Sequence, residues 1–272
     1  MRPESEPVRG RALEDRVVLD ASVEAVWRAL TDAEELVRWF PLQAAVEPGV
    51  GGTITLSWGE SGAGGATIAI WEPNRRLRTV ESRRDKAGRL VEIAVDYFIE
   101  AEGGRTTLRV VHAGFGSGAE WDEEYDGTVR GWRYELRGLR HYLRRHRGEA
   151  RRVAWVAGRT SLSAEACYAR CMGSAGLIRE GTVEGAPEGQ AYRIAGIAGV
   201  FEGQVLVNRP PLDFAGTVTN LNDGLLRYEF YGGSARLWLA TWGVDERAVR
   251  ELETRLREIM VRGVTPEALG PV

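Results

Sequence analysis

The sequence contains few of the residues that build disulfide frameworks, metal centres or membrane spans. It has only 2 cysteines and 3 histidines among 272 residues, and no apolar run approaches the roughly 18 residues that a membrane span needs. Residues 1–12 lack the apolar core of a secretory signal and are expected to form a disordered leader. Two cysteines without an export signal indicate a reducing cytoplasm. We therefore expect a cytoplasmic protein with no membrane span, no metal and no cofactor.

An excess of positive charge is also lacking. The formal net charge is −3 and the sequence pI is about 5.8, so the composition gives no reason to expect nucleic acid as a partner. With 43% hydrophobic and 28% charged residues, the chain has an ordinary globular composition. Its length suits two domains or one large one.

The first half shows an order of strand, helix, several strands and a long helix. A strand at 16–21 leads to Ser22, which can cap a helix whose apolar residues recur at helical spacing. Strand-like runs then follow at 53–58, 66–71 and 76–82, and the segment 91–115 alternates as a hairpin around Gly103-Gly104. A long amphipathic helix begins near Gly127 and carries Trp132, Leu136, Leu139 and Leu143 on one face.

The second half repeats this plan in weaker form. "ASVEAVWRAL" aligns with "LSAEACYARC", which pairs Ser22 with Ser163, and Gly103-Gly104 aligns with Gly232-Gly233. A last amphipathic helix is predicted at 245–260. Shared element order and local motifs indicate duplication, so we expect a first domain at 13–148 and a divergent second domain at 153–264.

The same alignment explains two features that resemble metal sites. Cys167 and Cys171 lie four residues apart on a predicted helix, a spacing that can present two thiolates to a metal. They align with the core positions Val26 and Leu30, which favours buried small hydrophobic residues. The acidic stretch 120–126 can in principle hold a cation, but it precedes a helix whose N-terminus favours negative charge.

Five segments of the first half carry a resemblance to a known family. They are "SVEAVWRALTDAEELVRWF", "GGTITLSW", "IWEPNRRLRTVES", "TTLRVVHAGFG" and "GWRYELRGLRHYL". In order and spacing they resemble the bacterial homologues of the activator of heat-shock-protein-90 ATPase. That family lies within the START-like superfamily, which includes polyketide cyclases and the birch-pollen allergen. The resemblance covers most of 16–147 and implies an α+β helix-grip fold. In this fold an antiparallel sheet curls round a long C-terminal helix and leaves a cavity between them. Residues 153–262 resemble the family only faintly, and they lack the longer segment between the last strand and the last helix. We therefore expect an open cavity in the first domain and a reduced one in the second.

Strand parity and the family register together predict which side chains enter the first cavity. Alternation places His112 on the same face as Leu108 and Val110, and the family register places Glu81 inside the cavity. A carboxylate beside imidazole would favour the imidazolium, so the two form a candidate acid/base or anchoring pair. The alternative is that the aromatic side chains simply fill a core. The predicted ligand-binding residues are Trp39, Phe40, Leu56, Trp58, Leu77, Glu81, Val95, Tyr97, Val110, His112, Phe115 and Trp132.

Three classes of function remain open. The first is non-enzymatic binding of a small hydrophobic molecule, which a mostly apolar cavity with a few polar groups suits. The second is a hydrolase or cyclase-like enzyme that uses Glu81 and His112, although no serine or cysteine nucleophile accompanies them. The third is a chaperone-associated or other protein-interaction module, which only the family name suggests.

A possible interaction surface lies on the second hairpin. The alignment places Leu237 and Leu239 inward, which leaves Trp238 and Trp242 on the other face of the same strand. Two outward tryptophans predict a contact with the first domain or with a second copy of the chain. A register shifted by one residue would instead place both indoles in the second core.

Overall fold

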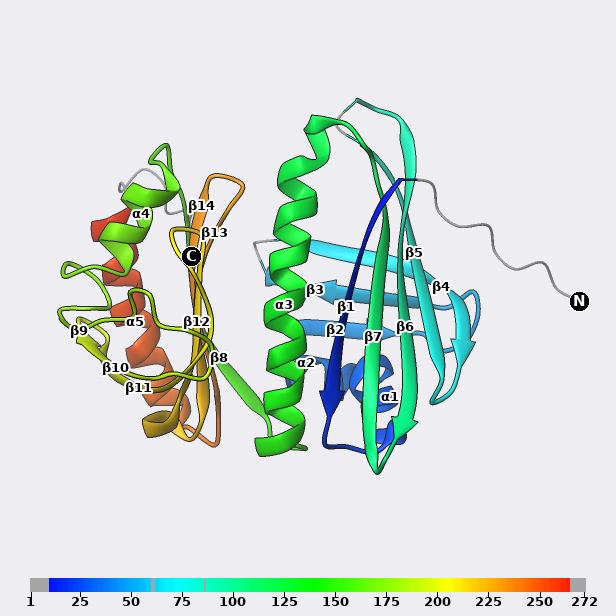
Figure 1. The fold of residues 1–272 in the computed structure, drawn as a ribbon, viewed down its shortest axis with the longest axis horizontal. Coiled ribbons are helices and arrows are strands. Elements are labelled where there is room, and N and C mark those ends of the chain that lie inside the picture. Colours follow the sequence, from blue (N-terminus) through cyan, green and yellow to red (C-terminus); the bar gives the residue numbers. More distant parts are fainter. Residues whose placement is uncertain (1–9, 60–61, 86, 265–272) are drawn as a thin grey trace, which may run out of the picture. The chain divides into compact units, whose positions relative to one another are not determined.

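The computed structural model describes residues 10–59, 62–85 and 87–264. They form two compact units that divide between Gly148 and Glu149, and each unit contains an antiparallel sheet with a long helix (Figure 1). Strand β1 begins at Arg11, inside the leader expected at 1–12, and residues 1–9 of that leader lie outside the described part of the chain. Among the described helices, none is both long and apolar enough to cross a lipid bilayer.

The first unit contains a seven-stranded sheet in the order β1-β7-β6-β5-β4-β3-β2. Its elements are β1 (Arg11–Leu19), α1 (Val23–Thr31), α2 (Ala33–Val37), β2 (Gln43–Val46), β3 (Thr53–Ser57), β4 (Ala63–Glu72), β5 (Arg76–Arg84), β6 (Leu90–Glu102), β7 (Arg105–Phe115), the 3-10 helix η2 (Ala119–Trp121) and α3 (Asp122–Arg145). The strands curl round α3, and α1 and α2 close one end of the sheet (Figure 1). This arrangement is the helix-grip fold that the sequence predicted.

Local signals account for the first helix and for the central hairpin. The Ser22 hydroxyl accepts a hydrogen bond from the backbone N–H of Ala25 at 3.3 Å, which satisfies one of the free donors at the start of α1. The hairpin between β6 and β7 turns at Gly103 and Gly104, whose φ angles of +57° and +80° suit glycine. Both predictions are confirmed.

Helix α3 begins at Asp122, five residues before the expected start at Gly127. The acidic residues Asp122, Glu123 and Glu124 form its first turn, where carboxylates stabilise the positive end of the helix dipole. The prediction treated this acidic stretch as a segment preceding the helix, and the start of the helix was therefore placed too late.

The second unit repeats the architecture, with a seven-stranded sheet in the order β8-β14-β13-β12-β11-β10-β9. Its elements are β8 (Arg151–Arg159), α4 (Ala164–Cys171), β9 (Glu180–Gly181), β10 (Ala191–Gly196), β11 (Gly199–Arg209), β12 (Asp213–Val218), the 3-10 helix η3 (Thr219–Leu221), β13 (Gly224–Tyr231), β14 (Ser234–Trp242) and α5 (Glu246–Gly263). Helix α5 packs against the sheet and α4 lies beside it (Figure 1). The tandem duplication is therefore visible in the fold itself.

The matched motifs occupy equivalent places in the two units. Ser163 caps α4 as Ser22 caps α1, and Gly232 and Gly233 form the turn between β13 and β14 with positive φ angles. Cys167 and Cys171 are buried in the core of the second unit, as the alignment predicted. Burial raises the pKa of the Cys171 thiol to about 12, so this sulfur stays protonated at neutral pH.

The faces of β14 follow the predicted register. Leu237 and Leu239 are buried in the core cluster of the second unit, which excludes a shift of one residue. Trp238 lies on the opposite face, where its ring meets Trp155 edge to face at 5.1 Å between centroids. A contact of Trp238 and Trp242 with another domain or another copy stays a prediction. The reduced cavity of the second unit stays a prediction too.

Candidate functional site

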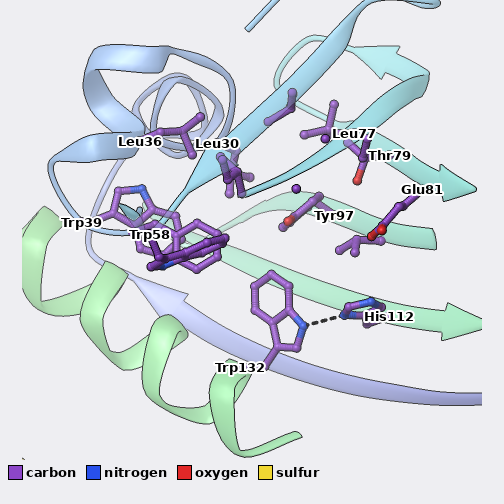
Figure 2. Close-up of a pocket in the computed structure, with 17 residues that line it drawn as sticks. Leu30, Leu36, Trp39, Trp58, Leu77, Thr79, Glu81, Tyr97, His112 and Trp132 are labelled. Carbon is purple, nitrogen blue, oxygen red and sulfur yellow. Dashed lines mark hydrogen bonds between the residues drawn. The ribbon is translucent and has the colours of Figure 1, made fainter. Parts of the chain in front are cut away.

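A cavity of about 250 Å³ lies in the first unit between the curled sheet, the two short helices and α3 (Figure 2). Helices α1 and α2, the five strands β3 to β7 and one residue of α3 contribute to its wall. Its lining residues are Leu30, Leu36, Trp39, Phe40, Ile54, Leu56, Trp58, Gly64, Gly65, Ala66, Leu77, Thr79, Glu81, Val95, Tyr97, His112 and Trp132. The wall is therefore mostly apolar, with a few polar groups.

Strand register explains how residues distant in sequence meet at this wall. Thr79 pairs with Val95 across β5 and β6, and Val95 pairs with His112 across β6 and β7. Directly paired residues point to the same face of a sheet, so one row of side chains from three strands faces the cavity. Glu81 lies two residues beyond Thr79 on β5 and therefore shares that face.

One side of the cavity is aromatic and rigid. The indole N–H of Trp39 donates to the carbonyl of Ala29 at 2.9 Å, which fixes the ring at the end of α1. Phe40 stacks on Trp39 with 5.0 Å between ring centroids and meets Trp58 edge to face at 5.4 Å. Figure 2 shows Trp39 and Trp58 on the side of the cavity near Leu36. These contacts hold the three rings together as an apolar aromatic wall.

The polar groups gather on the other side (Figure 2). The side chains of Thr79 and Glu81 come from β5, Tyr97 from β6 and His112 from β7. Burial raises the pKa of the Tyr97 hydroxyl well above its usual value, so the phenol stays neutral. This side can therefore offer hydroxyl groups, a carboxylate and an imidazole to a bound molecule.

His112 is bound to the long helix and not to Glu81. The indole Nε1–H of Trp132 donates to Nδ1 of His112 at 3.0 Å. Burial first, and the nearby Arg83 guanidinium second, lower the pKa of His112 to about 4. The sequence predicted that a carboxylate would favour the imidazolium, and this was wrong, because apolar surroundings and a positive neighbour both disfavour the charged ring.

Glu81 instead has a basic neighbour on its own strand. Its carboxylate lies 3.8 Å from Nε of Arg83, and Arg83 also binds Glu124 in the first turn of α3. The Arg83 guanidinium lies over the ring of Trp121 at 5.5 Å. Glu81 and His112 therefore line the same cavity, as predicted, but no hydrogen bond or ion pair joins them in the described structure.

Ten of the twelve predicted ligand-binding residues line the cavity, and Val110 and Phe115 do not. Val110 is completely buried on the same face as His112. Phe115 is buried too, and it contacts His112 and the segment that begins α3, with ring centroids 4.9 Å from His112 and 5.4 Å from Tyr125. Both residues are therefore part of the packed core beside the cavity.

A bulge in β7 explains the place of Phe115. Ala12 of β1 pairs with Ala113 while Arg11 pairs with Phe115, so Gly114 is an extra residue in the ladder. Its φ of +107° favours glycine, and a Cβ at this position would lie 2.1 Å from the carbonyl oxygen of Glu92. The extra residue ends the simple alternation directly after His112.

Several lining residues were missing from the predicted set. They are Leu30, Leu36, Ile54, Gly64, Gly65, Ala66 and Thr79. Strand alternation puts Ile54 on the face of Leu56 and Thr79 on the face of Leu77 and Glu81. The apolar face of α1 could have indicated Leu30. No sequence signal indicates the β4 segment Gly64 to Ala66, because glycine carries no side chain whose pattern shows a face.

The acidic stretch at the start of α3 is held by arginines. Glu120 lies 3.3 Å from Arg89, Asp122 lies 2.7 Å from Arg11, and Glu124 binds Arg83. Within residues 10–59, 62–85 and 87–264, no group of three or more His, Cys, Asp and Glu side chains could hold a metal ion. These carboxylates therefore tie α3 to β1 and to the β5–β6 hairpin.

Comparison with known proteins supports the fold of the first unit. Residues 20–144 match the family described as "Activator of Hsp90 ATPase homolog 1-like protein". No curated protein matches the chain in sequence.

The chain is also similar to several solved structures. Protein MLL2253 from Mesorhizobium loti is 24% identical, over 50% of this chain and 98% of its own, with a TM-score of 0.45. The di-domain ARO/CYC BexL from the BE-7585A biosynthetic pathway is 16% identical, over 93% and 97%, with a TM-score of 0.45. The Aha1 dimer from Colwellia psychrerythraea is 19% identical, over 51% and 99%, with a TM-score of 0.44. None of these likenesses assigns an activity to this chain.

Proposed function

We propose that the first unit, whose residues 20–144 match the family described as "Activator of Hsp90 ATPase homolog 1-like protein", binds a small, mostly apolar molecule without converting it. The observation that carries the proposal is the cavity of about 250 Å³ with a fixed aromatic wall and polar groups gathered on one side. Such a cavity has the character of small-molecule sites, which are largely apolar with a few placed polar groups.

Size and wall shape narrow the ligand class. The volume of about 250 Å³ lies just below the range of about 300–1,000 Å³ that ligand pockets occupy, which favours a molecule of one or two fused rings. Phe40 and Trp58 meet at 5.4 Å between centroids, and Tyr97 and Trp132 meet at 5.8 Å. Rings held in this way lose little conformational freedom when a planar aromatic ligand stacks on them.

The hydrolase or cyclase-like alternative requires a base or a nucleophile that faces the ligand. Among the described lining residues there is no serine or cysteine. The Nδ1 lone pair of His112 already accepts the Trp132 indole N–H, and burial keeps the Tyr97 phenol protonated. Glu81 is the remaining candidate base, and its carboxylate lies 3.8 Å from Nε of Arg83, which is already an ion-pair partner for it.

The alternative of a chaperone-associated module rests on the family name. Such a partner would need a contiguous apolar patch. The large apolar side chains exposed among the described residues are scattered over separate elements: Val18, Val50, Leu90, Val200 and Val261. This distribution gives no support to a protein-binding surface of that kind.

Binding can be tested with 2-naphthol, a two-ring probe whose fluorescence changes when it leaves water. We expect saturable binding to the full chain at about 1:1. The substitution Val95→Phe places a ring in the cavity and should weaken binding by about tenfold or more. The matched substitution Val111→Phe adds the same ring on the opposite face of the sheet and should change binding by less than about twofold.

Two results would contradict the proposal. One is the absence of saturable binding by the wild-type chain at probe concentrations that a cavity of this size should fill. The other is binding that Val95→Phe leaves unchanged, which would place the probe elsewhere on the molecule. Steady turnover of a bound ester or ketone by the wild-type chain, lost in Glu81→Gln, would support the enzyme alternative.

A further inference from the structure

The hydrogen bond between Trp132 and His112 determines where the imidazole carries its proton. An indole Nε1–H can only donate, so Nδ1 of His112 must be the acceptor across the 3.0 Å that separates the two nitrogens (Figure 2). A neutral imidazole with an accepting Nδ1 carries its proton on Nε2. The structure therefore fixes one tautomer of His112 without any reference to a ligand.

Packing holds both rings in this orientation. Trp132 is buried and lies between Phe40, at 6.4 Å between centroids, and Tyr97, at 5.8 Å. The His112 ring is supported by Phe115 at 4.9 Å. Burial and the Arg83 guanidinium lower the pKa of His112 to about 4, so the ring stays neutral at physiological pH. Neither ring can easily rotate to exchange the two nitrogens.

The protonated nitrogen has no partner in the described structure. His112 lines the cavity, its Nδ1 is occupied by Trp132, and no described residue accepts a hydrogen bond from Nε2. Thr79 and Tyr97 also present polar groups to the cavity, but a hydroxyl can rotate to donate or to accept. Nε2–H of His112 is therefore a neutral donor of fixed polarity at the polar side of the cavity.

We infer that the ligand presents a hydrogen-bond acceptor of the carbonyl type to Nε2–H of His112. Trp132 is the positioning residue, because its bond to Nδ1 keeps the proton of the imidazole on Nε2 and so makes the site prefer an acceptor. The inference rests on the proposed binding function and specifies its ligand class as a small aromatic ketone or a similar conjugated carbonyl compound. A conjugated carbonyl keeps its oxygen in the plane of the ring, so the ring can stack on the aromatic wall while the oxygen reaches His112. A cation or a pure donor at this point would leave the Nε2–H unpaired, which is unfavourable in a buried site.

A matched pair of probes tests the inference. 1-Acetonaphthone and 1-ethylnaphthalene have nearly the same shape and differ in the carbonyl oxygen. Their dissociation constants should be measured by calorimetry for the wild-type chain and for variants, and the quantity compared is the ratio of the two constants. Taking this ratio within each protein and comparing it between proteins cancels the different hydration of the two probes.

Three variants separate the roles of the two residues. His112→Phe keeps a ring but removes the donor, and should lower the preference for the ketone by about fivefold to tenfold. His112→Gln restores an N–H close to the position of Nε2 and should recover most of it. Trp132→Phe keeps the aromatic wall but frees Nδ1, so the imidazole can adopt either tautomer, and the preference should fall to an intermediate value.

Nitrogen-15 NMR of the histidine rings gives a readout that does not depend on a ligand. The chain has 3 histidines, and the signal missing from His112→Phe identifies that of His112. We expect the Nε2–H tautomer in the wild-type chain and a mixture of tautomers in Trp132→Phe. An Nδ1–H tautomer in the wild-type chain would overturn the inference.

The outcomes distinguish this inference from the proposed function. If neither probe binds the wild-type chain, the binding function itself fails. If both probes bind and the preference for the ketone is the same in the wild type and His112→Phe, the cavity is a binding site but the carbonyl inference is wrong.

Discussion

The Tyr142 hydroxyl donates a hydrogen bond of 2.7 Å to Oε2 of Glu35 and so joins the last turns of α3 to α2. The other oxygen of Glu35 binds Arg38 at 2.6 Å, and the Tyr142 oxygen accepts the backbone N–H of Gly148 at 3.0 Å. Tyr142 is completely buried. Helix α2 contributes Leu36 to the cavity wall, so this link stabilises one end of the candidate site.

Tyr142→Phe should therefore loosen α2. The substitution removes the bond to Glu35 and leaves the Gly148 N–H without its acceptor, at an expected cost of about 1–2 kcal/mol. Hydrogen exchange followed by mass spectrometry should show faster exchange in peptides from α2, by about fivefold or more. Tyr125→Phe is the control, because the Tyr125 hydroxyl binds the Ala12 carbonyl near the opposite end of α3. Equal exchange of α2 in both variants would contradict the prediction.

Replacing tyrosine by phenylalanine should change the stability of the second unit differently at two buried positions. The Tyr192 hydroxyl donates to the carbonyl of Thr217 at 2.7 Å, whereas the Tyr228 hydroxyl has no hydrogen-bond partner among the described residues. Tyr192→Phe should destabilise the unit by about 1 kcal/mol, and Tyr228→Phe should be neutral or stabilising by up to about 1 kcal/mol. Urea unfolding curves measure both. A larger loss in Tyr228→Phe than in Tyr192→Phe would show that the Tyr228 hydroxyl has a partner.

The sequence could predict which faces of the strands meet the cavity, because alternation is a property of each strand alone. Val95, Tyr97 and His112 were placed correctly for this reason. Alternation from His112 would place Phe115 on the outer face, and it is the bulge at Gly114 that returns Phe115 to the side of His112; this bulge depends on how β7 pairs with β1, more than 90 residues away in the chain. A glycine in a strand can indicate a bulge, but it does not say which side chains the bulge redirects.

The sequence could not predict which polar groups bind each other. Parity and the family register placed Glu81 and His112 in one cavity, and that is where they lie. Their strands β5 and β7 are separated by β6, so the two side chains have other neighbours. Glu81 lies near Arg83, and His112 binds Trp132. The partner of a buried polar group depends on how the helix docks on the sheet, and strand periodicity carries no information about that.

The guanidinium of Arg83 should hold the pKa of His112 lower than burial alone does. Arg83→Met removes the positive charge and keeps the aliphatic part of the side chain, so the pKa of His112 should rise from about 4. It should stay below 6.5, because burial is the larger cause of the shift. An NMR titration of the His112 ring measures the change. Arg84→Met is the control on the same strand, since Arg84 binds the exposed carbonyl of Gly88; an equal rise in both variants would contradict a local effect.

The low pKa of His112 also predicts how stability depends on pH. In the folded chain the pKa is lowered from 6.5 to about 4, so between these values the unfolded state binds the proton more readily. The neutral ring therefore favours folding. Its contribution to the free energy of unfolding is fully present above pH 6.5 and declines as the pH falls toward 4. The charged groups at this side of the cavity are Glu81, Arg83 and Glu124.

His112→Phe should remove this pH dependence. The variant leaves the Trp132 indole N–H without its acceptor, so it should be less stable than the wild type at pH 7.5. When the pH is lowered to 4.5, the free energy of unfolding of the wild type should fall by up to about 3 kcal/mol more than that of the variant. The difference in stability between the two proteins should therefore narrow or reverse. Urea unfolding at both pH values measures the double difference, in which the acid sensitivity of all other groups cancels. A gap that stays constant between pH 7.5 and 4.5 would mean that His112 titrates normally and that the cavity admits water to its ring.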